Sequence, residues 1–130
     1  MNAHYDSLYL FINGEWIAAS ERDTAPVVNP ATLQELARVP LATAADLDQA
    51  LQTAKRAFDV WCNTVPAERA RILKDGANLI RERAAHIAEL LTLEEGKPLA
   101  ESRDEVLRAA EYFEWFAEEA KRVYGDVIPA

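Results

Sequence analysis

The sequence predicts an α/β chain, in detail an α+β arrangement that is mostly helical with a small antiparallel β portion. Two observations carry this prediction. Before Thr43 the chain has short apolar runs separated by turn residues, whereas after it the apolar residues recur every three to four positions. We therefore expect a hairpin and extended segment over residues 1–42 and a helical segment of three to four amphipathic helices over residues 43–130.

The first extended part centres on the stretch LYLFINGEWIAAS, residues 8–20, which holds Asn13-Gly14 between two apolar runs. Asn-Gly is the strongest short signal for a type I′ hairpin, because both central residues of that turn need a positive φ. The stretch APVVNPATLQELARVPLA, residues 25–42, adds two extended pieces with a turn at Asn29-Pro30, since proline disfavours a helical residue before it.

The first helix is predicted to begin at Thr43, because Thr43 and Asp46 form a capping-box pattern. The apolar positions that follow share one stripe, which is the spacing of an amphipathic helix. The stripe consists of Leu47, Ala50, Leu51, Ala54, Ala57, Phe58 and Trp61.

A second helix is expected to start near Pro66, which a first turn tolerates, and to run unbroken until Gly96. Gly96 suits the left-handed residue after a helix, Lys97 can neutralise the negative helix end, and Pro98 cannot continue the helix. Gly76 lies inside the helix and predicts either a close helix contact or a bend. The apolar face of this helix is Leu73, Ala77, Ile80, Ala84, Ile87 and Leu91.

A final helix is predicted with Ser102 as its N-cap, Glu105 as the capping-box partner and Gly125 as its end. Residues 126–130 are then expected to begin another extended segment. The predicted buried stripe of this helix is Val106, Ala109, Ala110, Phe113, Phe116, Ala117, Ala120 and Val123.

Composition narrows the class of protein. The 130 residues carry 22 acidic and 14 basic side chains, a net charge of −8 that argues against nucleic acid or an anionic membrane as a partner. No apolar run approaches the ~20 residues of a membrane span, and no leader is recognisable at the amino terminus. A single cysteine excludes an internal disulfide, and we expect a cytoplasmic protein.

Residue chemistry alone predicts no active site. The four glycines are scattered, so a phosphate-binding loop is not expected. A zinc site would lack ligands, because His4 lies near the terminus and no second histidine or cysteine shares the face of His86. Cys62 is the one candidate thiol nucleophile, but no histidine lies near it in sequence to act as a base, which favours a structural cysteine.

Two other patterns have ordinary structural explanations. The acidic pair Glu94-Glu95 fits a solvated helix face. Trp115 and Phe116 point about 100° apart on a helix, so that one could meet a partner or a cavity while the other faces the core. Packing in the core is the default interpretation of both Trp115 and Phe116.

Several stretches, taken in order, resemble the amino-terminal part of the NAD(P)-dependent aldehyde dehydrogenase superfamily. They are INGEW (12–16), VNPAT (28–32), AFDVW (57–61), ERARIL (68–73), TLEEGKPLAES (92–102) and GDVIP (125–129). Each stretch alone is weak, whereas the ordered set is highly specific. The stretch EWFAEEAKRVYGDVIP (114–129) further resembles the succinate-semialdehyde dehydrogenase branch.

The resemblance implies a partial aldehyde dehydrogenase fold, in which residues 1–42 and 43–130 form the N-terminal part of the cofactor-domain region. Members of the family oxidise an aldehyde to the acid: a cysteine attacks the carbonyl, hydride passes to NAD or NADP, a glutamate activates water and an asparagine holds the oxyanion. The resemblance places these residues beyond residue 130, so Cys62 does not match the nucleophile. It implies no catalytic or cofactor-binding residue here, and no cofactor is expected to bind this chain alone.

Some relatives hold a monovalent cation between backbone carbonyls beside the NP turn and a carboxylate just before GKP. By resemblance these positions are Val27, Val28 and Glu94, although many relatives have aspartate at the last one. A plain helix-end glutamate is the favoured interpretation of Glu94. The helix with Trp115 and Phe116 borders the substrate entrance in similar enzymes.

These observations leave three hypotheses. In the first, the chain is the leading segment of an aldehyde dehydrogenase whose expected substrate is succinic semialdehyde. This chain alone would be inactive, and its partner would be the remainder of the enzyme. Alternatively it is a stand-alone helical interaction module, or it self-associates to cover its apolar stripe.

Overall fold

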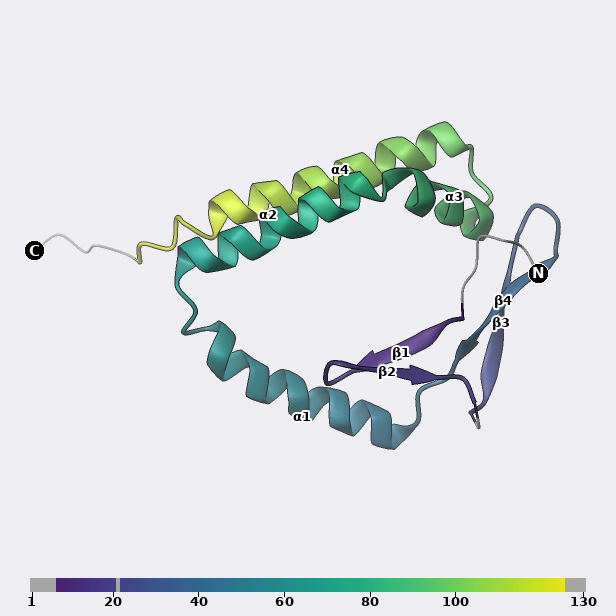
Figure 1. Ribbon diagram of the computed structural model, residues 1–130, viewed down its shortest axis with the longest axis horizontal. Helices are drawn as coiled ribbons and strands as arrows, with labels where there is room; N and C mark the ends of the chain where they lie inside the picture. The colour runs from purple at the N-terminus through teal and green to yellow at the C-terminus, as the bar shows by residue number, and fades with distance from the viewer. Residues whose placement is uncertain (1–6, 21, 126–130) are drawn as a thin grey trace, which may run out of the picture.

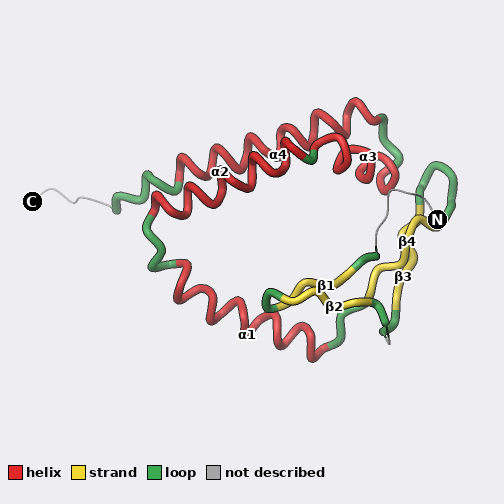
Figure 2. The backbone as a smooth tube through the Cα atoms, viewed as in Figure 1, coloured by secondary structure: helices red, strands yellow, loops and turns green. Residues whose placement is uncertain are grey.

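The computed structural model describes residues 7–20 and 22–125. Four short strands precede four helices within these residues, as Figures 1 and 2 show, which confirms the predicted class. The elements are β1 (Tyr9–Ile12), β2 (Glu15–Ala18), β3 (Thr24–Val28), β4 (Glu35–Pro40), α1 (Ala44–Trp61), α2 (Pro66–Glu82), α3 (Ala84–Glu95) and α4 (Leu99–Glu119). The extended segment predicted for 126–130 and His4 lie outside the described residues.

Strands β1 and β2 form the predicted hairpin. Asn13 and Gly14 have φ angles of 55° and 83°, the pair of positive values that a type I′ turn needs. The register pairs Phe11 with Trp16, and their ring centroids lie 4.6 Å apart. Tyr9 meets the same indole edge-on at 6.2 Å, so one face of the hairpin carries three aromatic rings.

Strands β3 and β4 pair antiparallel, with an irregularity in register between Val27 and Val28. The side chain of Asn29 accepts hydrogen bonds from the backbone N–H groups of Ala31 (2.9 Å) and Thr32 (3.2 Å). This local bonding is how asparagine stabilises a turn. The predicted turn at Asn29-Pro30 is confirmed.

Helix α1 begins with the predicted capping box. The Asp46 backbone N–H donates to Thr43 Oγ1 at 3.2 Å, and the Thr43 N–H donates to Asp46 Oδ2 at 2.7 Å. The Arg22 guanidinium donates to both carboxylate oxygens of Asp46, at 2.6 and 3.1 Å. Hydrogen bonds from Arg22 and then from Thr43 hold the pKa of the Asp46 carboxyl well below its usual range. The start of α1 is therefore fixed to the segment that follows β2.

The rest of α1 is not buried. Its apolar stripe was predicted to face a core, yet Leu47, Leu51 and Phe58 are 58%, 60% and 65% exposed. Asp46 is the one residue of this helix that is buried. The amphipathic pattern was read correctly as a helix, but of its predicted stripe only Ala50 is partly buried by the described residues.

The second predicted helix is in fact two helices, which corrects the expectation of an unbroken one. At Arg83 the backbone takes φ −99° and ψ 6°, and α3 starts in a new direction (Figure 1). The break allows both halves of the stripe to reach α4, with Ala77 on α2 and Ala88 on α3 fully buried. Gly76 makes the predicted close contact, because a Cβ there would lie 3.4 Å from the Phe113 ring of α4.

Helix α3 ends as predicted, but α4 begins differently. Gly96 is left-handed at φ 74°, and its N–H donates to the Thr92 carbonyl at 2.9 Å. Pro98, not Ser102, is the N-cap of α4, since its fixed φ suits the position and it has no N–H to satisfy. Ser102 is buried inside the helix, where its hydroxyl hydrogen-bonds Thr92 Oγ1 at 2.8 Å.

The Lys97 ammonium pairs with Glu95 (3.0 Å) and Glu105, which supports its predicted place at the helix end.

The end of α4 is also earlier than predicted. The helix stops at Glu119 and not at Gly125, because the chain tightens into turns in which Lys121 and Arg122 donate to carbonyls three residues back. Of the predicted stripe, Val106, Ala110 and Ala117 are buried, whereas Phe113, Phe116 and Val123 are exposed.

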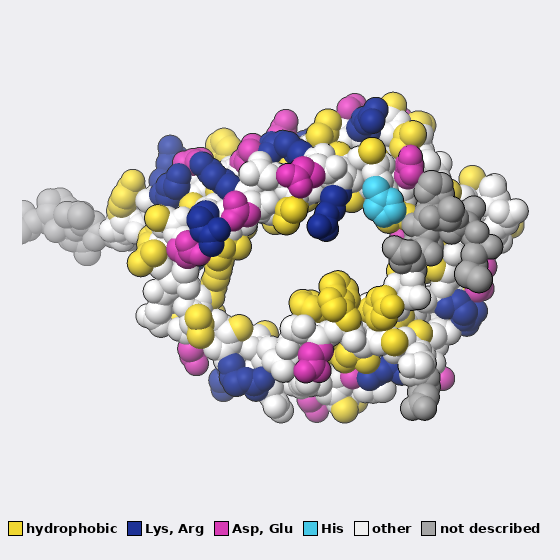
Figure 3. Space-filling view, viewed as in Figure 1, with side chains coloured by type: hydrophobic (Ala, Val, Ile, Leu, Met, Phe, Trp, Pro, Cys, Tyr) yellow, Lys and Arg dark blue, Asp and Glu magenta, His cyan; other side chains and the backbone are white. Residues whose placement is uncertain are grey.

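The helices and strands are arranged around an opening. Helices α2, α3 and α4 pack together on one side, α1 lies opposite them, and the two strand pairs close the ring (Figures 1 and 2). The space-filling view keeps the opening and shows hydrophobic side chains gathered on its rim over β1 and β2 (Figure 3). Within the described residues, no helix is long and apolar enough to cross a membrane.

Candidate functional site

The outer face of α4 carries a groove that the sequence did not predict. It has a volume of about 370 Å³ and is lined by Arg108, Glu111, Tyr112, Trp115 and Phe116. Trp115 and Phe116, for which packing was the default interpretation, are both exposed. The adjacent aromatic pair in the sequence was the available signal, but periodicity alone could not say that neither ring would be covered.

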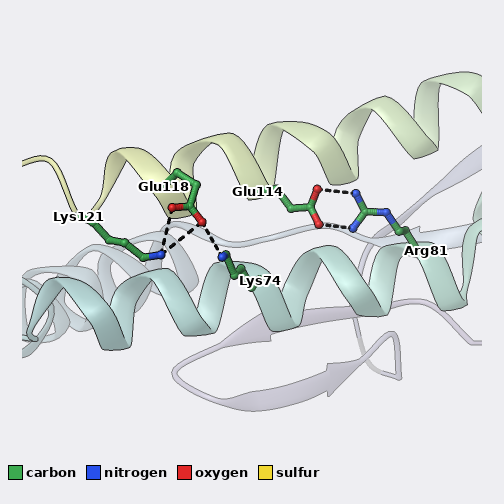
Figure 4. A network of polar contacts seen from close by, with 5 residues as sticks. All are labelled: Lys74, Arg81, Glu114, Glu118 and Lys121. Atoms are coloured by element: carbon green, nitrogen blue, oxygen red, sulfur yellow. Dashed lines mark hydrogen bonds and ion pairs between the residues drawn. The ribbon is translucent and has the colours of Figure 1, made fainter.

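Ion pairs beside this groove hold α4 to α2 (Figure 4). The Arg81 guanidinium and the Glu114 carboxylate form two parallel hydrogen bonds of 2.7 Å. The hydrogen bonds from Arg81 lower the pKa of Glu114, and the hydrogen bond from Lys74 lowers that of Glu118, which also meets Lys121 at 3.1 Å. Bidentate pairing fixes orientation as well as distance, so these contacts set the direction in which the groove faces.

The positions named for a monovalent cation lie just before two turns that meet. A Cβ on Gly96 would lie 2.9 Å from Pro30, so the turn after α3 rests against the turn after β3. Glu94 is in the last turn of α3, while Val27 and Val28 end β3. Among the described residues no three His, Cys, Asp or Glu side chains are grouped to hold a metal ion. Cation binding at Val27, Val28 and Glu94 stays a prediction.

Cys62 is exposed at the end of α1. Its thiol donates to the Asp59 carbonyl at 3.6 Å, and the Asn63 amide donates to the sulfur at 3.4 Å. A nucleophilic cysteine needs a base such as imidazole within hydrogen-bond reach. His86 lies on α3 and does not make these bonds, so the partners of the thiol are those of a helix end.

The described residues form an α+β fold of two antiparallel strand pairs and four helices. The aldehyde dehydrogenase family model matches residues 16–130. The chain belongs to the aldehyde dehydrogenase family.

Two relatives show how much of such an enzyme the chain represents. The 3-sulfolactaldehyde dehydrogenase of Pseudomonas putida is 47% identical over 119 residues, which are 92% of this chain and 24% of the relative. The NADP(+) succinate-semialdehyde dehydrogenase of Escherichia coli is 46% identical over 118 residues, 91% of this chain and 24% of the relative. The chain thus spans about a quarter of the length of these relatives and corresponds to their amino-terminal portion.

Solved structures agree in fold. An aldehyde dehydrogenase from Brucella melitensis biovar abortus superposes with a TM-score of 0.90 at 45% identity, covering 100% of this chain and 27% of that chain. A second neighbour, PnpE in complex with nicotinamide adenine dinucleotide, has a TM-score of 0.89 at 36% identity over 96% of this chain and 26% of its own. The open arrangement of α1 opposite α2 and α4 is therefore also found in these longer chains.

Proposed function

We propose that this chain forms the amino-terminal part of an NAD(P)-dependent aldehyde dehydrogenase that oxidises succinic semialdehyde to the carboxylic acid. The observation that carries the proposal is the identity of 46% over 91% of the chain with an NADP(+) succinate-semialdehyde dehydrogenase. The succinate and glutarate semialdehydes and the 3-sulfolactaldehyde in the names of other relatives share one chemistry, an aldehyde on a short chain that ends in an anionic group.

The chain alone is proposed to be inactive and to bind neither NAD nor NADP. Acyl transfer to a thiol needs a base and an oxyanion site beside the nucleophile. Cys62 has a backbone carbonyl and an amide as its partners, and the glycines of a dinucleotide-binding loop are missing from the sequence. Its proposed partner is the remainder of the dehydrogenase.

A chimera tests this proposal. The matching residues of the Escherichia coli enzyme are replaced by this chain, and oxidation of succinic semialdehyde is followed through NADPH absorbance. We expect turnover by the chimera and none by the isolated chain with either cofactor. A folded chimera without turnover contradicts the proposal that this chain can serve as the amino-terminal part of such an enzyme, and turnover by the isolated chain contradicts its inactivity.

The monovalent cation is a separate proposal for the junction of the two turns. Support comes from the contact between Gly96 and Pro30, which places the ends of β3 and α3 together. We expect the melting temperature of the chain to rise when NaCl replaces choline chloride at equal ionic strength, and the rise to disappear in Glu94→Ala. An equal rise in the variant excludes Glu94 as a ligand.

A further inference from the structure

The turn between β1 and β2 joins an asparagine to a glycine at the surface of the chain. Asn13 and Gly14 are both exposed, and a Cβ on Gly14 would meet nothing within 4 Å. Asn13 is the one asparagine of the sequence that is followed by glycine. Because no side chain stands beside the Gly14 nitrogen, this nitrogen can closely approach the side-chain carbonyl of Asn13.

The folded turn is one peptide rotation away from a conformation in which these two groups meet. The first central residue of both type I′ and type II′ turns has a φ of about 60°, and the φ of 55° at Asn13 suits either. The two types differ in the ψ of that residue, which is about 30° in type I′ and about −120° in type II′. The second value eclipses the following backbone nitrogen with the Cβ of the same residue. It therefore brings the Gly14 nitrogen over the Asn13 side chain.

This rotation leaves the hairpin intact. It takes φ of Gly14 from 83° to about −80°, and glycine adopts both signs of φ about equally well. Types I′ and II′ are both two-residue hairpin turns, so Ile12 stays opposite Glu15 in either of them. The reactive conformation is therefore accessible from the folded chain without separation of the strands.

Helix α1 supplies a hydrogen-bond donor to the side-chain carbonyl of Asn13. Thr53 Oγ1 donates to Asn13 Oδ1 at 3.3 Å, and Arg56 Nη2 donates to Thr53 Oγ1 at 3.0 Å. Attack on the carbonyl carbon would place negative charge on Oδ1. A hydroxyl donor that is itself polarised by a guanidinium stabilises such a charge.

We propose that Asn13 is a site of spontaneous deamidation. The Gly14 backbone nitrogen attacks Cγ of Asn13, and the new C–N bond closes a succinimide ring. The backbone proton passes to the side-chain nitrogen, which leaves as ammonia. Water then opens the ring at either carbonyl carbon and gives aspartate or isoaspartate. The reaction consumes only water, and the proposal does not rest on the proposed function.

The two products differ in what they do to the hairpin. Aspartate keeps an oxygen that can accept from Thr53, and its negative charge lies near Arg56. Isoaspartate carries the backbone through the former side chain and adds one carbon atom to the loop. A two-residue turn can then no longer join β1 and β2 in the observed register. We expect aspartate to keep the hairpin against α1 and isoaspartate to loosen it.

Peptide-level mass spectrometry of the chain, incubated at mildly alkaline pH, tests the site. We expect Asn13 to convert at least about tenfold faster than Asn63 and Asn78, which are followed by residues with side chains. Gly14→Ala should slow conversion at Asn13 about tenfold, because the added Cβ crowds the attacking nitrogen. The proposal is overturned if Asn13 converts no faster than Asn63, or if Gly14→Ala leaves its rate unchanged.

A matched variant tests the part that α1 plays. Thr53→Val keeps the shape of the side chain and removes the hydroxyl, so conversion at Asn13 should slow by roughly fivefold, the worth of one hydrogen bond. Thr64→Val removes a hydroxyl that bonds the Val60 carbonyl and should leave the rate at Asn13 unchanged. Equal rates in the two variants overturn the role of Thr53.

Urea below the unfolding transition distinguishes rotation of the turn from unfolding of the chain. A local opening does not follow the population of unfolded chains, so the rate at Asn13 should stay within about twofold. Circular dichroism gives the unfolded fraction in the same samples. A rate that rises in step with that fraction shows that the folded turn does not react, and overturns the proposed route.

The stability of the products tests their effect on the hairpin. Asn13→Asp supplies the aspartate product and should melt within about 2 °C of the unchanged chain. The isoaspartate species, separated from the incubated chain by chromatography, should melt at least about 3 °C lower. An isoaspartate species as stable as the unchanged chain overturns the expected loosening.

Discussion

Helices α1 and α4 carry apolar stripes of similar spacing, but only the stripe of α4 has buried members. On α4, Val106, Ala110 and Ala117 lie against α2 and α3 and are almost fully inaccessible. On α1 the one buried residue is Asp46, which is charged and paired with Arg22. An amphipathic pattern thus specifies a helix and the face that will be covered, but not whether the partner belongs to the same 130 residues.

The two regions also differ in the size of what they bury. Ser102 is the largest fully buried side chain among the described residues, and the other fully buried side chains include Ala77, Ala88 and Ala110. Small side chains allow the backbones of α2, α3 and α4 to approach closely, so this unit is held by contact between helices. Many of the large apolar side chains lie on the outer surfaces, whereas Ile80, Ile87 and Leu91 are partly buried against the helical core.

The largest expected effect comes from enlarging a buried small residue. Ala110→Leu should lower the free energy of unfolding of the isolated chain by about 3 kcal/mol, because a close-packed helix contact has no room for the added atoms. Leu47→Ala on α1 should change it by less than about 0.5 kcal/mol, since that side chain is already exposed. Urea denaturation measures the free energy of unfolding of both variants. Equal changes would contradict the difference in packing between α1 and α4.

Gly96 and Gly14 form the next pair. Both have a positive φ, but a Cβ on Gly96 would meet Pro30 at 2.9 Å, whereas one on Gly14 would meet nothing within 4 Å. We expect Gly14→Ala to cost about 1 kcal/mol from its backbone conformation alone and Gly96→Ala about 2 kcal/mol. If chemical denaturation gives the same cost for both, the contact between the two turns does not stabilise the chain.

Removing the cap of α1 should have a local effect of about 1 kcal/mol. Thr43→Ala removes the hydroxyl that accepts from the Asp46 N–H. Amide hydrogen exchange in α1 should become several-fold faster, while the amides of α2 and α4 keep their rates. Faster exchange across all helices would show that α1 and the packed helices unfold as one unit.

The pH dependence of α1 should be small and restricted to acid. The folded pKa of Asp46 is depressed, so its contribution to stability is complete above the ordinary aspartate pKa of about 4 and is lost as the pH falls toward the folded value. Asp46→Asn should flatten the melting temperature between pH 5 and 3 relative to the unchanged chain. An identical acid slope in the variant would assign the slope to other carboxylates, such as Glu114, whose pKa is also lowered.

The sequence was sufficient wherever the signal is local. The Asn13-Gly14 turn, the Thr43 capping box and the left-handed Gly96 each follow from the conformational needs of a few neighbouring residues. The break at Arg83 and the burial of Ser102 depend on packing against another helix, so a pattern that looked like one long helix and a capping box gave the wrong boundaries.

The candidate site was predictable to a lesser degree. The order of short motifs predicted the family, which the comparisons confirm. Within the described residues, INGEW and VNPAT lie at the turns after β1 and β3, and TLEEGKPLAES spans the end of α3 and the start of α4. The groove on α4 was missed, since the exposure of Trp115 and Phe116 depends on what lies beyond the helix.

The exposed positions of the three tryptophans have a practical consequence. Trp16, Trp61 and Trp115 are 71%, 42% and 65% exposed, on the hairpin, at the end of α1 and on the groove of α4. Denaturing the isolated chain would therefore move its indole emission little, whereas covering Trp61 with another polypeptide would shift the emission to shorter wavelength. The natural fluorescence of this chain reports assembly far better than it reports unfolding.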